Sequence, residues 1–187
     1  ESILDDFMAR VIEESKAWMP GDPMDPATVM GPMIDAAQCK TVCDYVAIGQ
    51  EEGAELVFGG ATTMESTGGH YHEPTIFTGV SNDMRIAQEE IFGPVLSVLS
   101  FTTAEEAVQI ANDSIYGLAG AVWSRNINTA HKVAAAVRVG TMGINNYFGG
   151  DSTVPFGGFK QSGNGRDKSI HAFNDYTELK TTWIEFE

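Results

Sequence analysis

Two adjacent carboxylates stand directly before an apolar run in the stretch AQEEIFGPVLSV, residues 87–98. An isoleucine, an aromatic ring and a Gly-Pro turn separate Glu89 and Glu90 from that run. A carboxylate held rigidly at the start of a strand can accept two O–H donors, and charge-assisted hydrogen bonds are the strong kind. The pattern therefore indicates either a solvated turn or a site that binds the hydroxyl groups of a polyol.

A second candidate is the glycine-rich segment NNYFGGDSTVPFGGFKQSGNGRDKS, residues 145–169. It follows a predicted strand, and open α/β sheets bind ligands at the carboxyl ends of their strands. Apolar walls would come from Tyr147, Phe148, Phe156 and Phe159. The segment holds neither a complete G-x-G-x-x-G motif nor a P-loop motif. On spacing alone, a ligand-binding loop and a structural loop are equal alternatives.

The sequence holds one cysteine pair and one histidine pair that could form a redox or metal site. Cys39 and Cys43 lie four residues apart, on one face of a predicted helix. Redox pairs are more often Cys-x-x-Cys and zinc needs further ligands, so we expect ordinary, partly buried thiols. His70 and His72 alternate along an extended segment. A metal pair is possible there, but a structural role is favoured because no third ligand is evident.

The composition excludes several classes of partner. The 187 residues carry 11 basic and 26 acidic side chains and a formal net charge of −15. This balance argues against nucleic-acid binding, which needs phosphate-neutralising cations, and against docking on an anionic membrane. No apolar run approaches membrane-spanning length, and nothing resembles a signal peptide. Few cysteines fit a reduced, cytoplasmic setting.

The order of the predicted elements indicates the fold class. Residues 2–19 have helical spacing with Ser2 as N-cap, a Pro/Gly-rich loop covers residues 20–35, and a helix follows over residues 36–52. From Ala54 onward, strands and helices alternate, which predicts an α/β fold with a mostly parallel open sheet and flanking helices. The expected strands are residues 54–60, 95–101, 117–124 and 140–145, and the expected helices are residues 103–113 and 127–138.

Four motifs in order decide between these alternatives: EEIFGPV, NDSIYGLAGAVWS, GTMGINN and PFGGFKQSGNGRDKS. Together they resemble the C-terminal half of the catalytic domain of an aldehyde dehydrogenase. The variants NNYFGGDSTVPFGG and GRDKSIHAF…YTELKTTWI are most similar to the γ-glutamyl-γ-aminobutyraldehyde dehydrogenase branch of polyamine catabolism. The resemblance implies a partial catalytic domain over residues 1–175 and an oligomerisation strand over residues 176–187.

The resemblance also implies roles for single residues and a cofactor, NAD or NADP. Glu90 matches the acid that accepts hydrogen bonds from the nicotinamide-side ribose, Phe92 matches the aromatic near the nicotinamide, and Glu89 is expected to be solvated or structural. Four positions match the family's aldehyde entrance: Asn145, Tyr147, Phe148 and Gly150. Backbone carbonyls around Lys160 and Gly163 match a monovalent-cation site of some relatives.

The implied activity is NAD(P)-dependent oxidation of an aldehyde, with an ω-amino or γ-glutamylamino aldehyde as a candidate substrate. In the family, the cysteine nucleophile, the glutamate base and the dinucleotide-binding domain lie upstream of the residues matched here. We therefore expect the chain alone to be inactive, with neither Cys39 nor Cys43 as nucleophile. Alternating side chains over Tyr176–Phe186 predict pairing with another subunit in a homo-oligomer. The alternative is a stand-alone C-terminal module for oligomerisation or binding.

Overall fold

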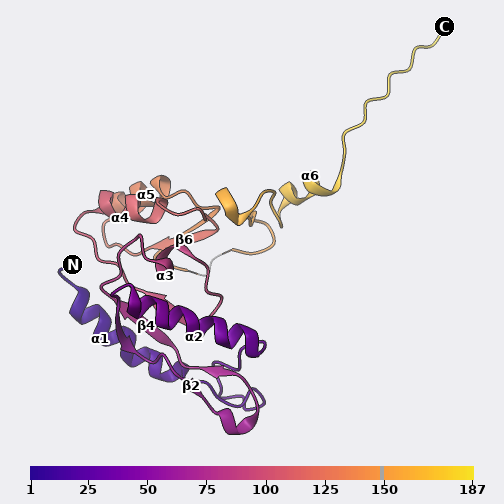
Figure 1. Cartoon of the computed structure of the whole chain (residues 1–187). Helices are drawn as coiled ribbons and strands as arrows, with labels where there is room; N and C mark the ends of the chain where they lie inside the picture. Colours follow the sequence, from indigo (N-terminus) through magenta and orange to yellow (C-terminus); the bar gives the residue numbers. More distant parts are fainter. Residues whose placement is uncertain (148–149) are drawn as a thin grey trace. The chain divides into compact units, whose positions relative to one another are not determined.

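The computed structural model describes residues 1–147 and 150–187, and its contacts divide the chain into two compact units (Figure 1). The units are Glu1–Thr102 and Thr103–Glu187. The expected division after residue 175, between a partial catalytic domain and an oligomerisation strand, stays a prediction. No helix among the described residues is long and apolar enough to cross a membrane. Each unit is described by itself.

The first unit places helices around a small mixed sheet. Its elements are α1 (Leu4–Ser15), η1 (Lys16–Trp18), α2 (Ala36–Glu51), β1 (Glu55–Phe58), β2 (Thr62–Thr63), η2 (Glu65–Thr67), β3 (Tyr71–His72), β4 (Thr75–Thr78), α3 (Arg85–Gln88) and β5 (Val95–Ser97). The sheet order is β1-β4-β5; β4 and β5 run parallel, whereas β1 is antiparallel to β4. The α/β prediction is confirmed, with antiparallel pairs added at β1–β4 and β2–β3.

Two local predictions for this unit were wrong. Helix α1 begins at Leu4 with Ile3 as N-cap, and no side chain caps it, so Ser2 does not have the expected role. The expected strand over residues 95–101 is paired only at Val95–Ser97, and Leu96 is 43% exposed. A continuous apolar run does not reveal where a strand ends. The hydrophobic pattern does not show which backbone groups form hydrogen bonds with the neighbouring strand.

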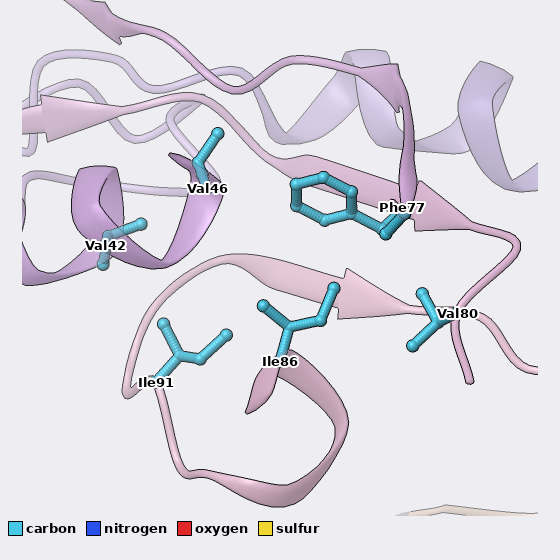
Figure 2. Packing of buried hydrophobic residues seen from close by; sticks show 7 residues of the cluster. Val42, Val46, Phe77, Val80, Ile86 and Ile91 are labelled. Atoms are coloured by element: carbon cyan, nitrogen blue, oxygen red, sulfur yellow. The ribbon is translucent and has the colours of Figure 1, made fainter. Parts of the chain in front are cut away.

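Helix α2 supplies the core of the first unit. Asp35 caps it by accepting a hydrogen bond from the backbone N–H of Gln38 at 2.8 Å. Its Val42 and Val46 side chains pack in one cluster with Phe77 of β4 (Figure 2). The cluster also contains Ala54, Val80, Ile86 and Ile91. Through Ile91, this core reaches the segment that follows the paired acids.

The second unit is built on two parallel strands with flanking helices. Its elements are α4 (Ala104–Asn112), β6 (Ala119–Val122), α5 (Ile127–Ala136), β7 (Thr141–Ile144), η3 (Lys160–Ser162), η4 (Ile170–Ala172) and α6 (Phe173–Tyr176). Strands β6 and β7 pair in parallel over their whole length. Thr102 and Thr103 are both candidate caps for the helix that follows them, and Thr103 caps α4, since its Oγ1 accepts a hydrogen bond from the N–H of Glu106 at 3.1 Å.

The end of the chain beyond α6 is an extended, exposed segment (Figure 1). Leu179, Trp183 and Phe186 are all exposed. Within the described part of the chain, residues 177–187 pair with no strand. Pairing of the expected strand Tyr176–Phe186 with another subunit therefore stays a prediction.

Truncation of the buried ring of Phe77 tests the core. Because Phe77 has 0% exposure, Phe77→Ala leaves a cavity as well as losing apolar burial. We expect the free energy of unfolding of the chain to fall by about 3–5 kcal/mol in urea denaturation. The matched control is Phe101→Ala, whose ring is 48% exposed. Equal losses for the two variants would contradict the assignment of the core.

Candidate functional site

The paired acids lie in the loop between α3 and β5. The loop ends where Pro94 accepts a hydrogen bond from the N–H of Thr75 in β4 at 2.8 Å. Glu90 is exposed, and among residues 1–147 and 150–187 its carboxylate has no hydrogen-bond or ion-pair partner. Its acceptor oxygens are therefore available to a ligand.

Phe92, two residues further on, also faces outward. Its φ of +55° lies in the left-handed region, where a residue with a side chain is strained by about 1–2 kcal/mol. The ring is 77% exposed. Gln38 of α2 compensates the strain, because its Nε2 donates to the carbonyls of Ile91 at 2.8 Å and Phe92 at 3.0 Å. The aromatic ring is thus free to pack against a bound group.

The loop lies directly against α2 at Gly93. A Cβ added there would lie 2.4 Å from Cγ2 of Val42, closer than real Cβ atoms approach their neighbours. Only glycine allows this close approach of backbone to helix. The position of the loop is therefore fixed by the same helix that forms the core.

Glu89 has two partners from different helices. Tyr45 of α2 donates its O–H to Oε2 of Glu89 at 2.6 Å, and Arg85 of α3 donates from Nε to Oε1 at 3.0 Å and from Nη2 to Oε2 at 2.9 Å. The Arg85 guanidinium also lies 5.5 Å from the centre of the Tyr45 ring. These donors, Arg85 first and Tyr45 second, lower the pKa of Glu89 to about 2. Of the two roles expected for Glu89, the geometry favours the structural one.

Three of the expected aldehyde-entrance residues are described, and all lie in the second unit. Asn145 follows β7; its side chain accepts from the N–H of Ser124 at 2.9 Å and donates to the Ser124 carbonyl at 3.1 Å. It lines an open groove of about 600 Å³ with Trp123, Ser124, Arg125 and Ile127. Tyr147 is exposed, and Gly150 has a φ of +120°. Phe148 lies outside the described residues.

Lys160 is the first residue of the short helix η3, and Gly163 follows its last residue. The ammonium of Lys160 donates to the carbonyls of Asn112 at 2.8 Å and Ser114 at 2.9 Å. It thus satisfies carbonyl groups at the C-terminal end of α4, where positive charge is favoured. The Lys160 carbonyl accepts a long hydrogen bond, 3.4 Å, from the N–H of Gly163. The monovalent-cation site proposed for these carbonyls stays a prediction.

The cysteine and histidine pairs lie in the first unit. Cys39 is buried in α2, and burial, with a smaller effect of Cys43, raises the pKa of its thiol. A raised pKa disfavours the thiolate that a nucleophile requires. His72 is buried with Nδ1 at 2.9 Å from the Glu73 carbonyl. Within the described ranges, no three His, Cys, Asp or Glu side chains are grouped to hold a metal ion.

Comparisons with known proteins agree over nearly the whole chain. The model of the aldehyde dehydrogenase family matches residues 1–182. NADP/NAD-dependent aldehyde dehydrogenase PuuC of Escherichia coli (strain K12) is 48% identical over 187 residues, which are 100% of this chain and 37% of that protein. This α/β chain with its paired-acid loop therefore belongs to the aldehyde dehydrogenase family.

Solved structures support the fold with similar coverage. An indole-3-acetaldehyde dehydrogenase in complex with NAD+ has a TM-score of 0.97 and 61% identity, covering 100% of this chain and 38% of that one. The γ-glutamyl-γ-aminobutyraldehyde dehydrogenase from Burkholderia cenocepacia J2315 has a TM-score of 0.94 and 51% identity, covering 97% of this chain and 37% of that one. The chain thus spans 37–38% of the length of these three relatives.

Titration of Glu89 tests the described contacts in the chain itself. Arg85 and Tyr45 favour the ionised carboxylate, so its pKa in the folded chain is about 2, below the ordinary 4.5. The stabilisation is present above pH 4.5 and is lost as the pH falls through about 2. Carboxyl-carbon NMR should show this titration, and Tyr45→Phe should raise the pKa. Tyr176→Phe, a matched control at an exposed ring, should leave the pKa of Glu89 unchanged. A Glu89 pKa near 4.5 in the unsubstituted chain would contradict the contacts with Arg85 and Tyr45.

Proposed function

We propose that the protein containing this chain oxidises an aldehyde to a carboxylic acid with NAD or NADP as oxidant. The supporting observation is the carboxylate of Glu90, exposed and without a partner among the described residues, on a loop held against α2. The adjacent hydroxyls of a ribose need an acceptor of this kind. The relatives include an enzyme described as NADP/NAD-dependent and another solved with NAD+.

The residues of the first unit fit the nicotinamide half of such a cofactor. Glu90 would accept hydrogen bonds from the ribose hydroxyls, and the exposed ring of Phe92 would pack beside the nicotinamide. A nicotinamide held there would supply a hydride acceptor for the oxidation. Glu90 has only acceptor oxygens when ionised, so its part is to bind and orient rather than to transfer a proton.

The nucleophile of the reaction is a separate requirement. Thioester chemistry needs a reactive thiolate, whereas Cys39 is buried with a raised pKa and Cys43 is partly buried in the same helix. We propose that neither acts as nucleophile and that the 187-residue chain alone does not turn over aldehyde.

For the substrate, we propose an ω-amino or γ-glutamylamino aldehyde. The support is the 51% identity to a γ-glutamyl-γ-aminobutyraldehyde dehydrogenase and the motif variants around residues 145–158. A second candidate is indole-3-acetaldehyde, because the relative that carries this substrate's name is 61% identical. Comparison of kcat/KM for the two aldehydes on the complete protein decides between them.

For assembly, we propose that residues 177–187 add a strand to a sheet of a second copy. Alternating apolar side chains stay exposed there, and an unpaired extended segment is a ready template for strand addition. If the chain existed as a stand-alone module, this pairing would be its function.

Replacement of the ribose-binding acid tests the proposed cofactor site. In the complete protein, Glu90→Gln removes the charge with little change of shape, and we expect the KM for NAD to rise about tenfold or more. Glu51→Gln, at an exposed acid that ends α2, is the matched control and should leave KM unchanged. Initial rates of NADH formation measure both.

Two results would overturn the proposal. An unchanged KM for NAD in Glu90→Gln would remove Glu90 from the cofactor site. NADH formation by the isolated 187-residue chain would show that the nucleophile lies within it.

Charge placed in the extended segment tests the assembly. Leu179→Asp with Trp183→Asp puts carboxylates where apolar side chains would be buried against a second copy, so we expect light scattering to report monomers. The unchanged chain is expected to form a dimer or larger assembly at micromolar concentration. Lys180→Gln alters charge without removing an apolar group and should preserve the assembly. A monomeric unchanged chain would contradict the strand-pairing proposal.

A further inference from the structure

The two acids of the EEIFGP motif have different environments although they are neighbours. Glu89 is bonded to Tyr45 and Arg85, whereas Glu90 has no partner among the described residues. Both side chains carry the same group, so the difference comes from where the backbone points them. The structure therefore assigns separate tasks to the two carboxylates.

The backbone geometry explains how one acid directs the other. Glu89 has φ −105° and ψ 146°, which is extended, and successive side chains of extended backbone point to opposite sides. With Glu89 turned toward α2 and α3, Glu90 is directed away from them. Ile91 alternates back and is buried in the core. The side chains on both sides of Glu90 are thus held, Glu89 by Tyr45 and Arg85 and Ile91 by the core.

The contact at Glu89 is itself held in place on both helices. The backbone N–H of Arg85 donates to Oε2 of Glu52, at the end of α2, at 2.8 Å. The guanidinium forms a bidentate ion pair with the Glu89 carboxylate and lies over the Tyr45 ring. Bidentate Arg–carboxylate pairs fix the orientation of the carboxylate as well as its distance from the guanidinium. Although the Glu89 side chain is 42% exposed, its direction is therefore defined by two side chains, Tyr45 and Arg85.

A second anchor lies on the other side of Glu90. Gln38 donates to the carbonyls of Ile91 and Phe92, and Gly93 lies against Val42. Without the contacts of Glu89 with Tyr45 and Arg85, which form the first anchor, residues 89 and 90 would be held only by the end of α3 and by this second anchor. With both anchors, the backbone of Glu90 is fixed one residue before and one residue after it.

We propose that Glu89 is a positioning residue for the cofactor site: held by Tyr45 and Arg85, it turns the Glu90 carboxylate outward toward the nicotinamide-side ribose. This inference rests on the proposed function of Glu90. Arg85 has a further effect, because its positive charge offsets that of Glu89 and leaves Glu90 as the uncompensated charge of the pair. The low pKa of Glu89, about 2, keeps this arrangement intact at neutral pH.

A double-mutant cycle in the complete protein tests the proposal. Glu89→Gln and Tyr45→Phe each weaken the first anchor while preserving side-chain shape, and the KM for NAD should rise about two- to tenfold. If Glu89 acts through Glu90, Glu89→Gln should have no further effect in a Glu90→Gln background. The matched control is Asp44→Asn, which breaks an exposed ion pair with Lys40 on the same helix and should not change KM.

A ligand that lacks the nicotinamide half distinguishes a specific effect on Glu90 from a general loss of structure in the binding site. The affinity for AMP, which lacks the nicotinamide-side ribose, should be unchanged in Glu89→Gln and in Tyr45→Phe. Equal weakening of AMP and NAD binding would show a merely structural role and overturn the inference. So would an effect of Glu89→Gln that persists in the Glu90→Gln background.

The outcomes also separate this inference from the function on which it rests. If Glu90→Gln alone leaves the KM for NAD unchanged, the proposed cofactor site fails. If Glu90→Gln raises KM but neither Glu89→Gln nor Tyr45→Phe does, only the positioning role of Glu89 fails.

Discussion

The packing of α2 against β4 and the paired-acid loop is the interaction on which the first unit depends. Val42 and Val46 of this helix pack with Phe77 in the core. Gln38 and Tyr45 of the same helix donate hydrogen bonds to the loop. Positions 38, 42, 45 and 46 fall on one face of a helix, since residues three and four apart are neighbours there. One face of α2 therefore contributes to the core and aligns the candidate cofactor site, so damage to the core should also disturb the loop.

The fold was largely accessible from the sequence, for identifiable reasons. The helix over residues 36–52 is expected from its amphipathic pattern and the following glycine, and α2 spans Ala36–Glu51. Thr103, one of the two threonines expected to cap α4, does so. The misplaced cap at Ser2 and the overlong strand at residues 95–101 show the limit: patterns mark the kind of element, but hydrogen bonds determine where it ends.

The candidate site was accessible only in part. The motif and the family resemblance indicated Glu90 and Phe92, and the structure places both exposed on one loop. The spacing of Arg85 and Glu89, four residues apart, is a signal for an ion pair that sequence reasoning passed over. The Tyr45 contact joins residues 44 positions apart, so no local pattern predicts it. The same holds for the 53-residue separation between Gln38 and Ile91.

The use of two acids where one binds the ligand follows from the chemistry of carboxylates. A single carboxylate that accepted bonds from Tyr45 and Arg85 would have little capacity left for ribose hydroxyls, because its lone pairs are limited. A single carboxylate left free on a short loop would have to be ordered when the ligand binds, at an entropic cost. Division of the tasks avoids both penalties: Glu89 is ordered on folding, and Glu90 keeps its acceptors. The left-handed backbone at Phe92 follows the same principle. Its strained conformation is already held in the folded chain by the hydrogen bond from Gln38, so ligand binding does not have to impose it.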